Sequence, residues 1–340
     1  MNINFIFRKN ISGRPSIHRN FEPMISKLIQ EGHSVTETFL PYDGGQPWNI
    51  LKNIIFLKKH RIKNGINHVT GDVHYAILAL IGVPSVLTIH DDYQVRGFSK
   101  HSLHYFYRWL FWIYFPIKFA REVVCITPST KKCIENYYDK KKLNVITHHD
   151  MTSDFPYSPK VFNTQCPTIF HMGTAKNKNL ETTLKAVSKI KCKLCVLKPM
   201  TELQKQTANS LHLDYENKYD LTNQEVYEEY KKADIILFPS LYEGLGMPVL
   251  EGQSIGRPVI TTNRDPMKWI AGKEGALLLN DPLDEEEMVK AIRQIVDNEE
   301  LRDSLVRNGR NNIKRFALDN AIKAYIDIYN KAIKNENINI

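Results

Sequence analysis

Two glutamates eight positions apart, Glu243 and Glu251, are the residues whose types and spacing most clearly indicate chemistry. Both lie in the run FPSLYEGLGMPVLEGQ, residues 238–253, in which a glycine-rich loop carries Glu243 and the following helix carries Glu251. Backbone N–H groups at such a helix start make a site for an anion. A carboxylate beside an anion site needs a partner of its own, such as the hydroxyls of a sugar or a ribose. Together these features indicate a nucleotide-sugar site.

A strand, a glycine loop, a helix and a second strand are predicted around these glutamates. Residues 233–238 form a short apolar run that is typical of a buried strand. Pro248 suits the first helical position, where its missing N–H is not needed. Gly256 stops the helix, and residues 258–262 return as the next strand.

The rest of the chain alternates strands and helices in two halves, separated by an irregular, proline-containing linker at 148–166. Residues 83–91 form a strand that delivers His90 and Asp91 at its C-terminal end, the edge at which open α/β sheets bind ligands. Further strands are expected at 3–7, 34–39, 122–127 and 168–172, and helices near 21–30 and 320–333. The pattern predicts an α/β protein with two doubly wound halves and a cleft between them.

Capping residues mark three helix starts in the second half. Asn179 is expected to cap the helix that follows it. Thr222 and Glu225 form a capping-box pair, and Asp284 and Glu287 indicate another such start.

Length and composition fit a soluble protein of two domains. The chain has 340 residues, 42% of them apolar and 24% charged, which is ordinary for globular domains. The N-terminus lacks the apolar core of a signal peptide, and no stretch reaches the roughly 18 apolar residues needed to span a membrane, so a cytoplasmic protein is expected. Cys192 and Cys195 form one Cys-x-x-Cys without a second pair, which favours reduced thiols over a metal site.

The run around the two glutamates, continued to residue 272, resembles the retaining glycosyltransferases of family 4, which have the GT-B fold. Their signature is a Glu, seven residues and a second Glu, here within Pro-Ser-x-x-Glu-Gly-x-Gly-x-Pro and followed by Gly-x-Pro-Val. Residues 173–180 resemble the family's Gly-x-x-x-x-Lys-Asn-Leu, and residues 84–91 its Pro-x-x-x-Thr-x-His-Asp. Within this family the chain resembles bacterial transferases of surface-polysaccharide assembly, such as O-antigen enzymes.

This resemblance implies two Rossmann-like domains facing each other across a cleft. Residues 1–155 would form the acceptor-side domain and residues 156–315 the nucleotide-sugar-binding domain. Residues 316–340 would form a C-terminal helix that crosses back and packs on the N-terminal domain.

Carried over to matching positions, the resemblance also implies a role for each site residue. Glu243 would contact the transferred sugar, Glu251 the ribose hydroxyls, and His90 the donor sugar from the opposite domain. Lys178 would neutralise the diphosphate, with oriented N–H groups stabilising the departing phosphate in the absence of a metal cofactor. The remaining donor-site and cleft-loop positions are Gly173, Thr174, Gly244, Leu245, Gly246, Met247 and Gly13.

The expected activity is transfer of a sugar, with retained configuration, from a UDP-linked donor to a lipid-linked saccharide at the inner membrane face. A nucleotide-sugar epimerase of the same fold is one alternative. A non-catalytic nucleotide-sugar-binding protein is another, because the chain departs from the family pattern twice. Thr174 stands where many members carry an arginine, and Trp269 stands where a glutamate is common. Asp91 and Asp92 form only a weak metal motif, which we interpret as structural or as polar lining.

The net charge of +9 is concentrated in two segments that contain no Asp or Glu, residues 44–71 and 93–121. The second segment includes the aromatic run 105–115. A helix rich in aromatic and basic residues fits contact with an anionic bilayer, and a buried helix flanked by solvated lysines fits equally well. No nucleic-acid-binding motif accompanies the charge, so nucleic acid is not an expected partner.

Overall fold

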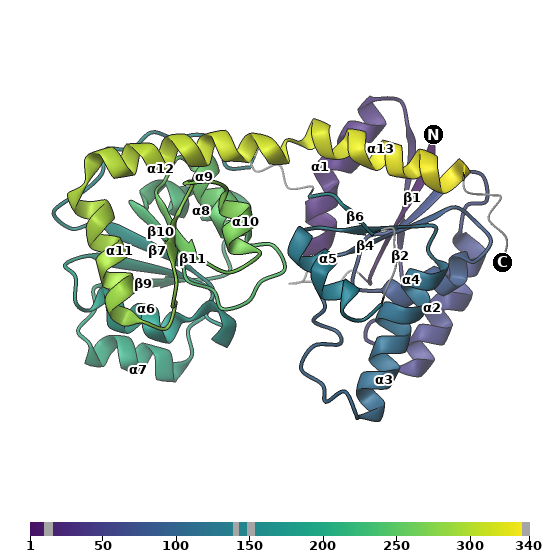
Figure 1. Cartoon of the computed structure of the whole chain (residues 1–340), viewed down its shortest axis with the longest axis horizontal. Coiled ribbons are helices and arrows are strands. Elements are labelled where there is room, and N and C mark those ends of the chain that lie inside the picture. Colours follow the sequence, from purple (N-terminus) through teal and green to yellow (C-terminus); the bar gives the residue numbers. More distant parts are fainter. Residues whose placement is uncertain (10–15, 139–142, 148–153, 335–340) are drawn as a thin grey trace. The chain divides into compact units, whose positions relative to one another are not determined.

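The computed structural model describes residues 1–9, 16–138, 143–147 and 154–334. The chain divides into two compact units (Figure 1). Unit 1 comprises Met1–His149 together with Phe316–Ile340, and unit 2 comprises Asp150–Arg315. Each unit is described by itself below.

Unit 1 is built on a six-stranded parallel sheet in the order β2-β1-β3-β4-β5-β6. Its strands are β1 (Asn2–Phe7), β2 (Ser34–Phe39), β3 (Ile66–Val69), β4 (Ser85–Ile89), β5 (Glu122–Cys125) and β6 (Leu143–Val145). Its helical segments are α1 (Ser16–Gln30), α2 (Pro47–His60), η1 (His74–Leu80), α3 (Leu103–Trp109), η2 (Leu110–Tyr114), α4 (Phe115–Phe119), α5 (Pro128–Glu135) and α13 (Leu318–Lys334). The strand order reverses between β1 and β3, so the switch point of this sheet, where open α/β sheets commonly bind ligands, lies at the carboxyl ends of these strands.

Unit 2 repeats the plan with the strand order β12-β11-β10-β7-β8-β9, again all parallel. Its strands are β7 (Thr168–Met172), β8 (Lys193–Leu197), β9 (Tyr215–Lys218), β10 (Ile235–Phe238), β11 (Val259–Thr262) and β12 (Leu277–Leu279). Its helical segments are η3 (Lys176–Lys178), α6 (Leu180–Val187), α7 (Glu202–Ser210), α8 (Asn223–Lys232), α9 (Met247–Ile255), α10 (Met267–Ala271), α11 (Glu285–Asp297) and α12 (Glu299–Asn312), and η4 (Ile313–Phe316) follows at the junction with unit 1. Here the order reverses between β7 and β10, the strands that precede the Lys178 and Glu243 loops.

Alternate side chains of β1 enter two different cores, as a strand covered on both faces requires. Ile3, Phe5 and Phe7 pack with α1 and α13, whereas Ile6 joins the core on the other face. The C-terminal helix α13 therefore completes unit 1, as the family resemblance implies. Its face includes two fully buried tyrosines, Tyr325 and Tyr329.

A buried polar chain joins α13 to the sheet of unit 1. The two ring nitrogens of His68 on β3 hydrogen-bond the Tyr329 hydroxyl and the Thr88 hydroxyl, both at 2.8 Å. Thr88 in turn contacts the Tyr325 hydroxyl at 3.1 Å. Burial lowers the pKa of His68 to about 3, with a smaller contribution from His90, so the ring is neutral in the folded protein.

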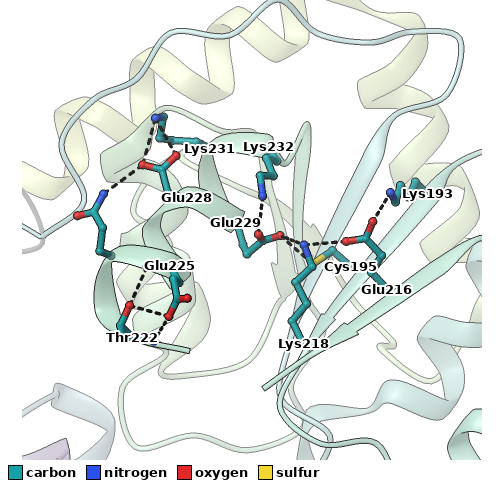
Figure 2. A network of polar contacts seen from close by, with 11 residues as sticks. Lys193, Cys195, Glu216, Lys218, Thr222, Glu225, Glu228, Glu229, Lys231 and Lys232 are labelled. Carbon is teal, nitrogen blue, oxygen red and sulfur yellow. Dashed lines mark hydrogen bonds and ion pairs between the residues drawn. The ribbon is translucent and has the colours of Figure 1, made fainter. Parts of the chain in front are cut away.

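Ion pairs cover the outer edge of the sheet in unit 2 (Figure 2). Lys218 on β9 pairs with Glu216 and with Glu229 of α8, each at 2.7 Å, and Lys193 on β8 also pairs with Glu216. Hydrogen bonds from Lys193 and Lys218 lower the pKa of Glu216 to about 2. Charged side chains on an edge strand oppose its pairing with another chain.

The local predictions are mostly confirmed, with three corrections at helix starts. Thr222 and Glu225 form the expected capping box. Pro248 occupies the second helical position, because α9 begins at Met247 after the N-cap Gly246. Asp284 caps α11, but the Glu287 carboxylate accepts from the N–H groups of residues 280 and 281, so no reciprocal box forms. Asn179 stands at the N-cap of α6 without capping it, for a reason given below.

Candidate functional site

Two loops at the switch point of unit 2 are joined by hydrogen bonds. One follows β7 at residues 173–179 and the other follows β10 at residues 239–246; because β7 and β10 are parallel neighbours, both loops leave the same edge of the sheet. The carbonyl of Asn177 accepts from the Leu241 N–H at 2.7 Å and from the Ser240 hydroxyl at 2.9 Å. The Asn177 side chain donates to the carbonyl of Tyr242 at 3.0 Å. The two predicted donor-site motifs thus form one structure.

Lys178 and Glu243 form an ion pair between these loops. The Lys178 ammonium and the Ser240 hydroxyl, the latter at 2.5 Å, both donate to Oε1 of Glu243. Lys178 also lies over the Phe238 ring, 5.0 Å from its centroid. Within the described residues Oε2 of Glu243 has no hydrogen-bond partner, and the side chain is 14% exposed. The pair is thus held on one side and can accept a ligand hydroxyl on the other.

Gly173 allows Lys178 to reach this position. Its φ is +97°, and a Cβ at this residue would lie 2.8 Å from Cγ of Lys178. Thr174, which stands at the family's arginine position, is held by backbone contacts. Its hydroxyl donates to the Pro199 carbonyl at 2.7 Å, and its carbonyl accepts from Gln204 at 2.9 Å.

Asn179 is a clamp between loops instead of a helix cap. It is buried, adopts the left-handed conformation with φ of 60°, and directs its amide away from the α6 backbone. The amide nitrogen donates to the carbonyl of Pro282 at 2.6 Å and to that of Pro239 at 3.4 Å. The amide oxygen accepts from the Thr182 hydroxyl at 2.7 Å. Asn179 thus ties the residue after Lys178 to the loop that carries Glu243.

The start of α9 presents backbone donors beside Glu243. Gly246 adopts φ of +99° at the N-cap, a conformation that favours glycine. Among the residues that the structure describes, the N–H groups of Gly244, Leu245 and Gly246 have no acceptor. Together with Met247 they form the donor-rich end of a nine-residue helix, whose dipole favours an anion.

Glu251 lies one helical turn into α9 and is buried. Its carboxylate accepts from the hydroxyl of Tyr230 on α8. Burial, followed by the charge of Glu251, raises the pKa of Tyr230 well above its usual value, so the phenol stays protonated and donates. The sequence analysis did not predict this contact; its only signal is the run Tyr-Lys-Lys-Ala-Asp, residues 230–234, which precedes β10.

His90 belongs to unit 1, where it follows β4 at the carboxyl edge of the sheet. Its Nε2 donates to the carbonyl of Thr70 at 2.8 Å. A Cβ at Gly71 would lie 2.5 Å from Cδ2 of the ring, so this glycine keeps the space that the imidazole occupies. Burial lowers the pKa of His90, which favours the neutral ring. Gly13, the predicted cleft-loop residue, lies outside the described residues.

A polar network that the sequence did not indicate lies near His90. Arg8, directly after β1, pairs with Asp72 at 2.7 Å. Gln94 donates to the other oxygen of Asp72 at 2.9 Å and accepts from Arg108 at 2.7 Å. Arg8, Asp72 and Gln94 follow β1, β3 and β4, respectively, and the parallel sheet brings the ends of these strands to one edge.

Asp91 and Asp92 are occupied by protein contacts. Asp91 accepts from the N–H of Tyr93 at 2.9 Å. Asp92 is buried and accepts from the Tyr137 hydroxyl at 3.0 Å. In the part of the chain that the structure describes, no three His, Cys, Asp or Glu side chains converge as a metal site would need.

Two family models match consecutive parts of the chain. Residues 13–148 match the model described as Glycosyltransferase Family 4, and residues 158–312 match the model described as Glycosyl transferases group 1. The first match falls within unit 1 and the second within unit 2.

Two sequence relatives agree with these family models. O-antigen chain mannosyltransferase B of Escherichia coli is 31% identical over 100 residues, which are 29% of this chain and 26% of the relative. The lipopolysaccharide core biosynthesis glycosyltransferase LpsD of Rhizobium meliloti is 24% identical over 223 residues, 63% of this chain and 65% of the relative. Each match thus spans less than two thirds of the relative's length.

The Anabaena protein HepE, solved in complex with UDP and glucose, has a TM-score of 0.74 to this chain at 13% identity, covering 96% of this chain and 99% of HepE. Two parallel Rossmann-like sheets, two consecutive glycosyltransferase models and this structural likeness agree. The chain therefore belongs to the family 4 glycosyltransferases with the GT-B fold.

Proposed function

We propose that the chain transfers a sugar from a nucleotide-sugar to a saccharide acceptor in the assembly of a surface polysaccharide. The observation that carries the proposal is the Lys178–Glu243 pair beside the open N–H groups at the start of α9. One cation and several backbone donors suit a diphosphate, and a carboxylate with an unpartnered oxygen suits sugar hydroxyls. The names of the E. coli and R. meliloti relatives support a polysaccharide product.

The donor in this proposal is UDP-linked, a choice supported by the UDP bound to HepE. The diphosphate binds Lys178 and the N–H groups of Gly244 to Met247, beside Gly173 and Thr174. Glu251, already oriented by Tyr230, accepts from the ribose hydroxyls. Glu243 accepts from hydroxyls of the transferred sugar through the oxygen that the lysine leaves open.

In the reaction, the bond between the anomeric carbon and the diphosphate oxygen breaks, and negative charge develops on the departing phosphate. Lys178 and the backbone donors are fixed before that charge appears, so they stabilise the transition state more than the ground state. The acceptor hydroxyl adds to the same face of the sugar, with retention, and the leaving phosphate takes its proton. We assign His90 to the donor sugar and the Gly13 loop to the acceptor side, without a metal cofactor.

Glu243→Gln keeps the side-chain volume and removes the charge, so transfer should fall by about two orders of magnitude or more while the melting temperature stays close to the wild-type value. Glu228→Gln is the matched control, because Glu228 lies on the solvent side of α8 and pairs only with its neighbours there. Normal turnover in the Glu243 variant would refute the assignment.

Incubation of the donor with and without an acceptor separates transfer from the other two expected activities. An epimerase converts the donor without an acceptor, and a binding protein releases no nucleotide from any donor. A thermal-shift panel of UDP-, GDP- and ADP-sugars then identifies the base, because a ligand that binds only the native state raises its apparent stability.

A further inference from the structure

The outer face of α2 carries three large apolar side chains that the described part of unit 1 leaves exposed. Trp48, Leu51 and Ile55 are 64%, 44% and 50% exposed. Their spacing of three and four residues places them along one stripe of the helix. Tyr42, just before α2, is also exposed.

The opposite face anchors α2 firmly, so the exposed stripe is a fixed surface. Ile50 and Leu57 are buried in the core of unit 1. Asn53 is buried as well, and its amide donates to the Tyr75 hydroxyl at 2.8 Å and to the Tyr42 carbonyl at 2.9 Å. Packing in the core of unit 1 therefore accounts for the apolar residues on the inner face of this helix, but it does not account for those on the outer face.

Basic side chains border the exposed stripe. The Lys52 ammonium lies 4.9 Å from the centroid of the Tyr42 ring and 5.8 Å from that of Trp48. Lys58 and Lys59 are exposed in the last turn of the helix. The helix contains no acidic residue, so its surface carries only positive charge.

The excess charge of the whole chain lies in the same unit. Unit 1 has 23 Lys and Arg against 13 Asp and Glu, whereas unit 2 has 23 against 24. Electrostatic attraction to an anionic surface would therefore act on unit 1, where the apolar stripe lies.

The aromatic run 105–115, the other expected membrane element, is explained largely by packing. Trp112 and Ile113 are 2% and 1% exposed, and Tyr105, Tyr107, Trp109 and Phe111 pack against the same core. A five-residue π-helical segment, η2, continues α3 into α4 and contains Trp112. Within the run, Phe106 of α3 stays exposed, and Tyr93, Phe98 and Leu103 before it are exposed as well.

We propose that α2 is the surface by which this protein binds an anionic lipid bilayer. Trp48, Leu51 and Ile55 enter the interfacial region, where Trp is favoured, and the flanking lysines contact lipid phosphates while their stems cover apolar surface. A protein partner fits this composition less well, because lysine is depleted in protein interfaces. In the described part of the chain no helix is long and apolar enough to cross a membrane.

Flotation with vesicles of phosphatidylcholine, with and without phosphatidylglycerol, tests the proposal on the full chain. The protein should bind the anionic vesicles, and added salt should weaken binding because it screens the lysines. The triple change Trp48→Ser, Leu51→Ser and Ile55→Ser should reduce binding at least about tenfold, since apolar burial and charge act together. Lys58→Glu with Lys59→Glu should reduce it by a similar factor.

Two matched variants distinguish this surface from others. Leu203→Ser changes an exposed leucine of α7 in unit 2 and should leave vesicle binding unchanged. Leu103→Ser with Phe106→Ser changes the exposed start of α3 and should also leave it unchanged. Every variant alters exposed positions, and an unchanged melting temperature verifies its fold.

Three outcomes would overturn the proposal. They are equal binding to neutral and anionic vesicles, wild-type binding by the α2 triple variant, and a dimer in light scattering that the triple variant dissociates. Vesicle binding needs neither donor nor acceptor. A failed sugar-transfer assay therefore leaves this result intact, and the reverse also holds.

Discussion

Asn179 offers a sharp test of how the donor site is held together. Its left-handed backbone and its three side-chain hydrogen bonds can be removed separately, because glycine keeps the backbone conformation and alanine does not. Asn179→Gly therefore removes the clamp alone. Asn179→Ala removes the clamp and adds backbone strain. Asn179→Asp keeps the shape but places a carboxylate oxygen against the Pro282 and Pro239 carbonyls.

The expected magnitude follows from the burial of the site. Loss of the amide leaves the carbonyls of the buried residues Pro282 and Pro239 without this donor, and each buried unsatisfied group costs about 1–3 kcal/mol. Glycine also gives the unfolded chain more freedom, worth about 0.5–1 kcal/mol. Asn179→Gly should therefore lower the free energy of unfolding by roughly 3 kcal/mol. Alanine avoids that entropic loss but incurs about 1–2 kcal/mol in the left-handed region, so it should be the less stable of the two by up to about 1 kcal/mol.

Hydrogen exchange of the β7 and β10 amides in the full chain reports the stability of unit 2 directly. UDP-sugar affinity reports the position of Lys178. We expect both to fall in Asn179→Gly, with slower turnover that Asn179→Asp does not rescue. Wild-type exchange and affinity in Asn179→Gly would refute the clamp. Equal stability of the alanine and glycine variants would refute the contribution of the left-handed backbone.

Three further predictions concern pH, surface charge and the glycine loop. His68 is neutral in the folded protein down to about pH 3 but protonated in the unfolded chain below about pH 6.5. Unfolding therefore takes up a proton, and the free energy of unfolding decreases as the pH is lowered from about 6.5 to about 3. The difference in unfolding free energy between wild type and His68→Gln should therefore change by about 1.4 kcal/mol per pH unit there, and a flat difference in acid titrations monitored by urea unfolding would contradict it. Glu216→Gln breaks the ion pairs with Lys218 and Lys193 at a solvated edge of the sheet, so the free energy of unfolding should fall by no more than about 1 kcal/mol. A loss of stability that persists in high salt would contradict this view. Gly173→Ala should displace the Lys178 side chain and weaken UDP-sugar binding about tenfold or more, measured by calorimetry; unchanged affinity would show that the loop adjusts freely.

The local features of this protein are readable from the sequence because short-range chemistry encodes them. Apolar runs and glycine stops placed β7, β10 and β11 within two residues of their observed ends. The glycines of the two donor loops occupy left-handed positions, at Gly173 and Gly246, that few other residues adopt. These properties depend on neighbours in the chain, so one sequence suffices to predict them.

Contacts between distant residues were decided only by the tertiary structure. Lys178 and Glu243 are 65 residues apart in sequence, and they meet because two parallel strands end side by side. Asn179 looked like a helix cap, yet its amide has better acceptors in the loops that the fold brings over it. Likewise, the aromatic run 105–115 and α2 both combine apolar and basic residues, and packing decided which apolar side chains are buried. A residue's type fixes the contacts that it can make, but the arrangement of the sheets selects the partner that it meets.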